Sequence, residues 1–262
     1  MFGHPLDTFR RQVHTVTAAG GTIPDTYAVI EQRWDRYLEL EHNTTALLAE
    51  AITTPGDTTD LTQLRALALA ERAGSIEQAD LTKELKAPVL LALRGLYEQV
   101  AAPNYKTLAD RFTATATAFT KAVHTIDPDL SAEQMVTEPD KARKAWTDAG
   151  ILAVELDQQL PALQAAATLA GLRVHDNDAL LPLTVDTDGH HRRRIWEAWE
   201  TSTGRTGKWG AIARLGAGIR AAHLDTYTPY RRPAPIEVKY VRGTGPYAGS
   251  VRVEHDPEDQ MI

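Results

Sequence analysis

Cysteine is absent from the 262-residue chain. Its absence excludes disulfide bonds, thiol nucleophiles and thiolate metal sites, and it agrees with a reducing compartment. Long apolar runs are also missing, because stretches such as 88–93 fall far short of the roughly 20 residues that cross a bilayer. The N-terminal segment MFGHPLDTFRR contains no apolar core of a secretory signal. We therefore expect a cytoplasmic protein or a component of an assembled particle, without membrane contact and not secreted by a signal peptide.

Catalytic signatures are equally scarce. Serine occurs only at positions 75, 131, 202 and 250, and none lies in a G-x-S-x-G nucleophile elbow. Gly207-Lys208 resembles the end of a phosphate-binding loop, but Trp209 replaces the required Ser or Thr and the loop is too short. The stretch GAGIRA (216–221) lacks the preceding strand of a dinucleotide site, so its small residues indicate close helix packing. We expect no cofactor and favour a non-enzymatic protein.

Hydrophobic residues (43%) and charged residues (24%) stand in the proportion typical of a globular protein. In the first two-thirds, apolar side chains recur at spacings of three and four, as in Tyr27, Ile30 and Trp34, which predicts helices. Ser75 with Gln78, and Ser131 with Gln134, have the spacing of capping boxes at helix starts.

Proline and turn-forming residues predict where the helices end. Pro88 and Pro161 are expected to kink or divide their helices. Further helices are expected at about 190–201 and 209–223. IEVKYV and SVRVEH then alternate apolar with charged residues around RGTGPYAG, which predicts a β-hairpin at about 236–255. The expected fold class is mainly α, an elongated multi-helix bundle with a C-terminal β-hairpin.

Charge divides the chain more clearly than its net value of −7 indicates. Residues 1–188 carry 16 Lys and Arg against 27 Asp and Glu, whereas residues 189–253 carry 12 against 4. We therefore expect an acidic helical bundle over 1–172, an Asp/Leu-rich connector over 173–188 and a basic aromatic segment over 189–262. The last segment includes the hairpin and ends in DPEDQMI, which indicates an acidic, mobile tail.

Aromatic residues interleave with the positive charges of this basic segment. Arginine neutralises phosphates and stacks on rings, so the combination is compatible with a surface that binds protein or nucleic acid. An alternative is intramolecular: the basic segment can pack on the acidic body, with its tryptophans in the core. The residues assigned to partner or nucleic-acid binding are Arg192, Arg193, Arg194, Trp196, Trp199, Lys208, Trp209, Arg231 and Arg232.

Histidine and aspartate also gather in the connector and just after it. His175, Asp178, Asp188 and His190 are of a type that binds zinc or manganese. Residues of this kind more commonly form turns and helix caps, because Asp and Asn bond to their own backbone. These four are weak candidates, and no metal is assigned.

Three functional hypotheses follow. The first is a non-enzymatic structural protein that docks through its basic aromatic C-terminal region onto the protein subunits of a larger assembly, such as a virion or other multiprotein particle, and that can form a homo-oligomer. The second is a nucleic-acid-binding accessory protein. The third is a metal-dependent enzyme that uses the His/Asp cluster near 175–191.

Overall fold

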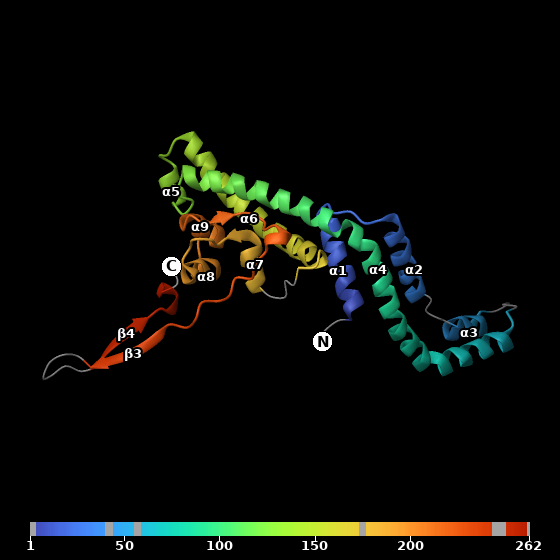
Figure 1. Cartoon of the computed structure of the whole chain (residues 1–262). Helices are drawn as coiled ribbons and strands as arrows, with labels where there is room; N and C mark the ends of the chain where they lie inside the picture. The colour runs from blue at the N-terminus through green and yellow to red at the C-terminus, as the bar shows by residue number, and fades with distance from the viewer. Residues whose placement is uncertain (1–3, 40–43, 55–58, 173–176, 243–249, 261–262) are drawn as a thin grey trace.

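The structure is a computed structural model that describes residues 4–39, 44–54, 59–172, 177–242 and 250–260. It confirms a mainly α fold with a C-terminal hairpin (Figure 1). The helices of the described residues are α1 (Pro5–Ala18), α2 (Asp25–Glu39), α3 (Thr44–Thr53), α4 (Leu61–Thr125), α5 (Ala132–Met135), α6 (Asp140–Leu169), α7 (Asn177–Thr184), α8 (Arg192–Thr201) and α9 (Gly207–Arg214). Short 3₁₀ turns follow at η1 (Leu224–Thr226) and η2 (Pro257–Gln260).

The core lies where α4 and α6 pack along each other and α7, α8 and α9 cover one side (Figure 1). Phe112 of α4 and Leu156 of α6 are fully buried there. Leu183 of α7 and Trp209 of α9 belong to the same cluster. The three segments expected from charge therefore share one hydrophobic core. A second cluster, which includes Tyr27 and other residues of α1, α2 and α4, lies further along α4.

Helix α4 continues through Pro88, and α6 continues through Pro161. The expectation was that these prolines kink or divide their helices, and division is wrong. Buried core residues lie within two positions of each proline: Leu90 is 8% exposed and Leu160 is 7% exposed. Burial of one such side chain stabilises by about 1.5–3 kcal/mol, which offsets a large part of the lost backbone hydrogen bond.

The two capping boxes have different outcomes. Ser131 accepts a hydrogen bond from the Gln134 N–H, and the Gln134 side chain accepts one from the Ser131 N–H, so this box is confirmed. Ser75 lies inside α4, so no helix begins there and the second box is wrong. The spacing alone does not distinguish a helix start from a helix interior.

The helix expected at 209–223 ends at Arg214. Gly216 has a φ of +78°, a left-handed conformation that favours glycine, and the chain reverses there. Gly218–Ile219 then forms strand β2, which pairs antiparallel with β1 (Val185–Asp186). The glycines of GAGIRA therefore make a turn and a strand, and the expected helix packing is wrong. The connector, too, contains a helix and a strand.

Among the described residues, no helix combines the length and apolar character that spanning a membrane requires.

Candidate docking site at the C-terminal hairpin

The predicted hairpin is confirmed as strands β3 (Glu237–Arg242) and β4 (Ser250–His255). It stands away from the helical body (Figure 1). Within the described part of the chain, each of these strands pairs only with the other. The outer edges of β3 and β4 therefore present backbone N–H and C=O groups that a further strand can use.

Both faces of the hairpin are exposed to solvent. Opposite residues of an antiparallel pair share a face, so Val238 lies with Glu254 and Lys239 with Val253. Tyr240 is 70% exposed and Val241 on the other face is 53% exposed. Alternation normally buries one face of a sheet, yet here apolar side chains remain in water on both. Among the described residues, no further layer covers the hairpin.

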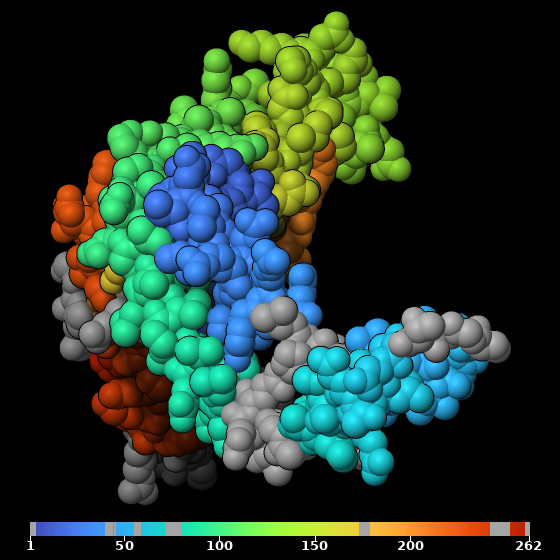
Figure 2. Space-filling model, turned by 90° about the vertical axis from the view of Figure 1, so that its right-hand side faces the viewer, coloured from blue at the N-terminus to red at the C-terminus, as the bar shows by residue number. Residues whose placement is uncertain are grey.

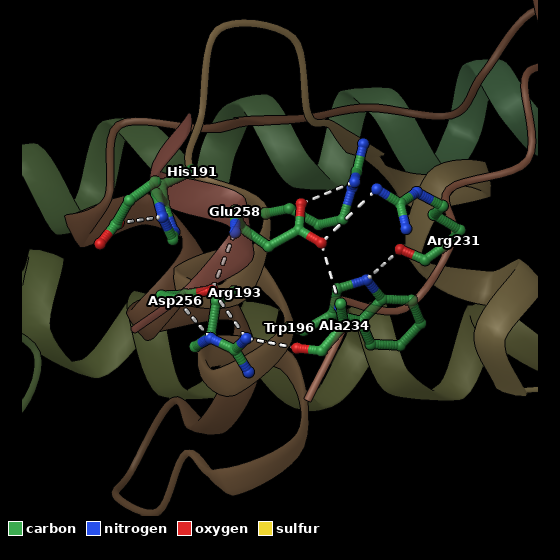
Figure 3. Close-up of polar contacts among 9 residues, drawn as sticks. His191, Arg193, Trp196, Arg231, Ala234, Asp256 and Glu258 are labelled. Carbon is green, nitrogen blue, oxygen red and sulfur yellow. Dashed lines mark hydrogen bonds and ion pairs between the residues drawn. The ribbon is translucent and has the colours of Figure 1, made fainter. Parts of the chain in front are cut away.

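The base of the hairpin is bound to α8 by Arg193 (Figure 3). The guanidinium of Arg193 donates through Nε and Nη2 to the two carboxylate oxygens of Asp256, the Nη2 bond being 2.8 Å. Nη2 also donates to the carbonyl oxygen of Ala234. Since Ala234 precedes β3 and Asp256 follows β4, one side chain joins both ends of the hairpin to the helix.

Glu258 completes this connection from the C-terminal side. Its side chain is 3% exposed and accepts hydrogen bonds from the Ala234 N–H at 3.0 Å and from Arg192 Nη1 at 2.7 Å (Figure 3). The nitrogen Nη2 of Arg231 lies 3.6 Å from the same carboxylate. We call Arg192, Arg193, Asp256 and Glu258 the hairpin anchor. The acidic tail is thus packed against the body in η2, and the expectation of a mobile tail is wrong for residues up to Gln260.

Hydrogen bonds to charged groups lower two carboxyl pKa values in the anchor. The bonds from Arg193 hold the pKa of Asp256 well below its ordinary value. The pKa of Glu258 is lowered chiefly by the Ala234 N–H and further by Arg192, although burial opposes the shift. Both groups are therefore ionised at neutral pH, and the anchor consists of charged partners.

The linker that leads to β3 packs on Trp196. This ring is 2% exposed, and its Nε1 donates to the Arg231 carbonyl oxygen at 3.0 Å. Tyr230 stacks on it at a centroid distance of 6.3 Å, and the Arg232 guanidinium carbon lies 4.8 Å from the ring centroid. Arg232 also pairs with Glu200 at 2.6 Å. Trp196 therefore fixes the chain before the hairpin.

Trp199, Lys208 and Trp209 form a second group that faces inward. Trp209 is fully buried, and its Nε1 donates to Asp157 Oδ1 at 3.0 Å. Lys208 pairs with the same carboxylate oxygen at 2.7 Å. The partly buried Trp199 contacts Trp209 edge to face at 5.5 Å.

These contacts agree with the intramolecular alternative for part of the basic aromatic segment, and partner binding by its residues stays a prediction. Trp196 and Trp209 belong to the core. Five of the assigned cations pair with carboxylates of the same chain: Arg192, Arg193, Lys208, Arg231 and Arg232. Arg194, by contrast, is exposed on α8. Sequence analysis missed Asp256 and Glu258, although the excess of acid in the tail was a usable signal beside the basic segment.

The four weak metal candidates are not brought together in the part of the chain that can be described. His175 and the side chain of Asp178 lie outside the described residues. Asp188 lines a polar hollow of about 330 Å³, where Arg220 lowers the pKa of Asp186. Among the described residues, the group with ligand spacing is His191, Asp256 and Asp259, whose ligand atoms lie within 4.8 Å of one another.

The carboxylate of Asp256 in that group already accepts hydrogen bonds from Arg193. Both of its carboxylate oxygens accept from Arg193, and a guanidinium beside a carboxylate repels a metal cation. His191 Nε2 lies 2.9 Å from Asp259 Oδ1, within hydrogen-bonding distance, and the Asp259 side chain is 68% exposed. The geometry therefore fits an ion-paired anchor better than a metal centre.

Comparisons with models of protein families, with curated proteins and with solved structures find no match to this chain.

Proposed function

We propose that this chain is a non-enzymatic assembly protein that docks onto the protein subunits of a larger particle through its C-terminal hairpin. The observation that carries the proposal is a two-stranded sheet whose two outer edges pair with no other described strand, with exposed apolar side chains on both faces and a base fixed by charged hydrogen bonds.

Stability supports a partner for the hairpin. An isolated two-stranded hairpin is marginal in water, and this one exposes Val238, Tyr240 and Val253. Addition of a strand from a partner would supply main-chain hydrogen bonds and place further side chains beside these on each face. The anchor reduces the entropy that such binding costs, because both ends of the hairpin are already held.

Charge pairing favours a protein partner over nucleic acid. Affinity for nucleic acid rests on cations that can replace counterions along the phosphates. Here Arg192 and Arg193 pair with tail carboxylates, and Lys208 pairs with Asp157. The basic segment therefore offers less positive charge to a ligand than its composition indicates.

A second projection gives further support. Helix α3 and the first part of α4 extend from the body on the side away from the hairpin (Figure 1) and stand out in the space-filling view (Figure 2). Ile52 is 63% exposed and Leu69 is 58% exposed on this arm. A subunit that contacts several neighbours needs more than one exposed apolar surface, and these two projections supply them.

Co-sedimentation from the native source tests the proposal. The full-length tagged chain is expected to sediment with large particles, and a Val238→Asp/Tyr240→Asp variant is expected to remain in the soluble fraction. A matched control, Ile151→Asp/Val154→Asp, changes two exposed apolar residues of α6 and should sediment as the wild type does.

Two results would contradict the proposal: a wild-type chain that sediments alone, or a hairpin variant that stays with the particles. Nuclease treatment separates the alternative, since release of the wild type by nuclease would favour nucleic-acid binding.

A further inference from the structure

We infer that the occupant of the β3 edge is a second copy of this chain, paired antiparallel strand to strand about Val238. This inference rests on the proposed function, because it names which neighbour the hairpin contacts in the particle. It joins two hairpins into one four-stranded antiparallel sheet with two-fold symmetry.

Symmetry determines which residues would meet. A two-fold axis perpendicular to the sheet at Val238 places this residue opposite its own copy. Residues equally distant on either side of Val238 then face each other: Glu237 meets Lys239 of the other copy, and Ile236 meets Tyr240. Each of these two contacts occurs twice, so the edge is complementary to itself.

The side chains involved are available for this pairing. Ile236, Val238 and Tyr240 lie on one face and are 43%, 42% and 70% exposed. On the other face, Lys239 Nζ lies 3.1 Å from Glu237 Oε2 of the same chain, and both side chains are at least half exposed. Exchange of such an exposed pair for the equivalent pair between copies costs little, because surface ion pairs contribute little.

This register is favoured over its neighbours on β3 by charge. An axis one residue later would place Lys239 opposite Lys239, and like charges directly opposite destabilise a sheet. Pro235 limits the ladder on the N-terminal side, since it has no backbone N–H to donate. The paired segment is thus Ile236 to Tyr240 in each copy.

The described side chains of β3 and β4 are similarly exposed, but the two strands adjoin the body differently. Figure 1 shows β4 leading back through η2 to the body beside α8, whereas β3 follows the extended linker. The anchor binds η2 and Ala234 to α8 and leaves the side chains of β3 from Glu237 to Val241 exposed.

Disulfide trapping tests the pairing directly, because the chain has no cysteine of its own. The full-length Val238→Cys variant is expected to form a reducible covalent dimer under mild oxidation, since opposite residues of an antiparallel pair lie within disulfide range. Val241→Cys on the same strand is the control: it is 53% exposed but lies three residues from the axis, so its two copies are far apart and it should remain mostly monomeric. Preferential cross-linking through position 241, or none through 238, would overturn the inference.

Charge exchange supplies a second test that does not depend on oxidation. Either Glu237→Lys or Lys239→Glu alone should weaken dimerisation at least about tenfold in sedimentation equilibrium, because two like-charge pairs replace two opposite ones. The double variant Glu237→Lys/Lys239→Glu should restore dimerisation to within about threefold of wild type. A double variant as weak as the single ones would refute this register.

Failure here is separable from failure of the proposed function. A wild-type chain that is monomeric in purified form but sediments with particles keeps the proposed docking and removes the self-pairing. A wild-type dimer that never joins particles would keep the self-pairing and remove the proposed docking.

Discussion

Residues 190–232 and the hairpin that follows them both interleave charged and apolar residues, but their environments are opposite. In residues 190–232, Trp196 and Trp209 are buried and the neighbouring cations find carboxylates within the chain. In the hairpin, Tyr240 and Val241 remain exposed, and the ion pairs join neighbours of one strand. Interleaved charge and apolar residues therefore do not by themselves mark a binding surface. The difference is whether another layer of the same chain is present to cover them.

The largest expected effect on the free energy of unfolding comes from the buried Trp209 of residues 190–232. Trp209→Ala should lower the free energy of unfolding by about 3–5 kcal/mol, because it removes a fully buried ring and leaves the Asp157 carboxylate without that donor. Tyr240→Ala on the hairpin should change it by less than about 0.5 kcal/mol. Denaturant unfolding of both variants measures the contrast. Equal losses would show that the hairpin packs on the body as tightly as the core does.

The next effect concerns the anchor between the two regions. Arg193→Ala should raise the exchange rate of the β3 and β4 amides at least about tenfold, because it removes charged hydrogen bonds to both ends of the hairpin. The amides of α4 and α6 should keep their protection. Arg194→Ala, the adjacent exposed arginine on α8, is the control and should leave the hairpin unchanged. Similar exchange in the two variants would show that the anchor does not hold the hairpin.

The smallest expected effect is the dependence of the hairpin's stability on pH. The folded-state pKa values of Asp256 and Glu258 lie below their ordinary values of 3.8 and 4.5. Their contribution to stability is therefore fully present above about pH 5 and is lost as the pH falls through the folded-state values. An acid titration followed by NMR should show the hairpin resonances changing before those of the helical core.

Asp256→Asn provides the comparison for that titration. It lacks the carboxylate that pairs with Arg193, so its hairpin should already be loosened at neutral pH and should change less on acidification. A titration identical to that of the wild type would show that the Asp256 carboxylate does not cause the pH dependence of the hairpin.

Local patterns predicted much of the fold. Spacings of three and four identified α2, the Ser131–Gln134 box identified the start of α5, and strict alternation identified β3 and β4. One failure shows the limit of such patterns. Pro161 was expected to kink or divide its helix, yet α6 continues through it, because packing of α6 on α4 supplies free energy that no local window contains.

The candidate site was predictable only in outline. Its location near the C-terminus and the apolar edge of the hairpin follow from residues 236–255 alone. The roles of Arg192 and Arg193 do not, because their partners Asp256 and Glu258 lie more than 60 residues later in the chain. Docking through the hairpin remains a prediction, and so do the alternatives.

By itself, the amino-acid sequence determined the helical class, the lack of thiol chemistry, the strands of the hairpin and the separation of acidic from basic segments, because these depend on residue type and short-range periodicity. Only the tertiary structure decided which charges are neutralised and which rings are buried. Ion pairs and core contacts join residues far apart in the chain, and their geometry exists only once the helices have packed.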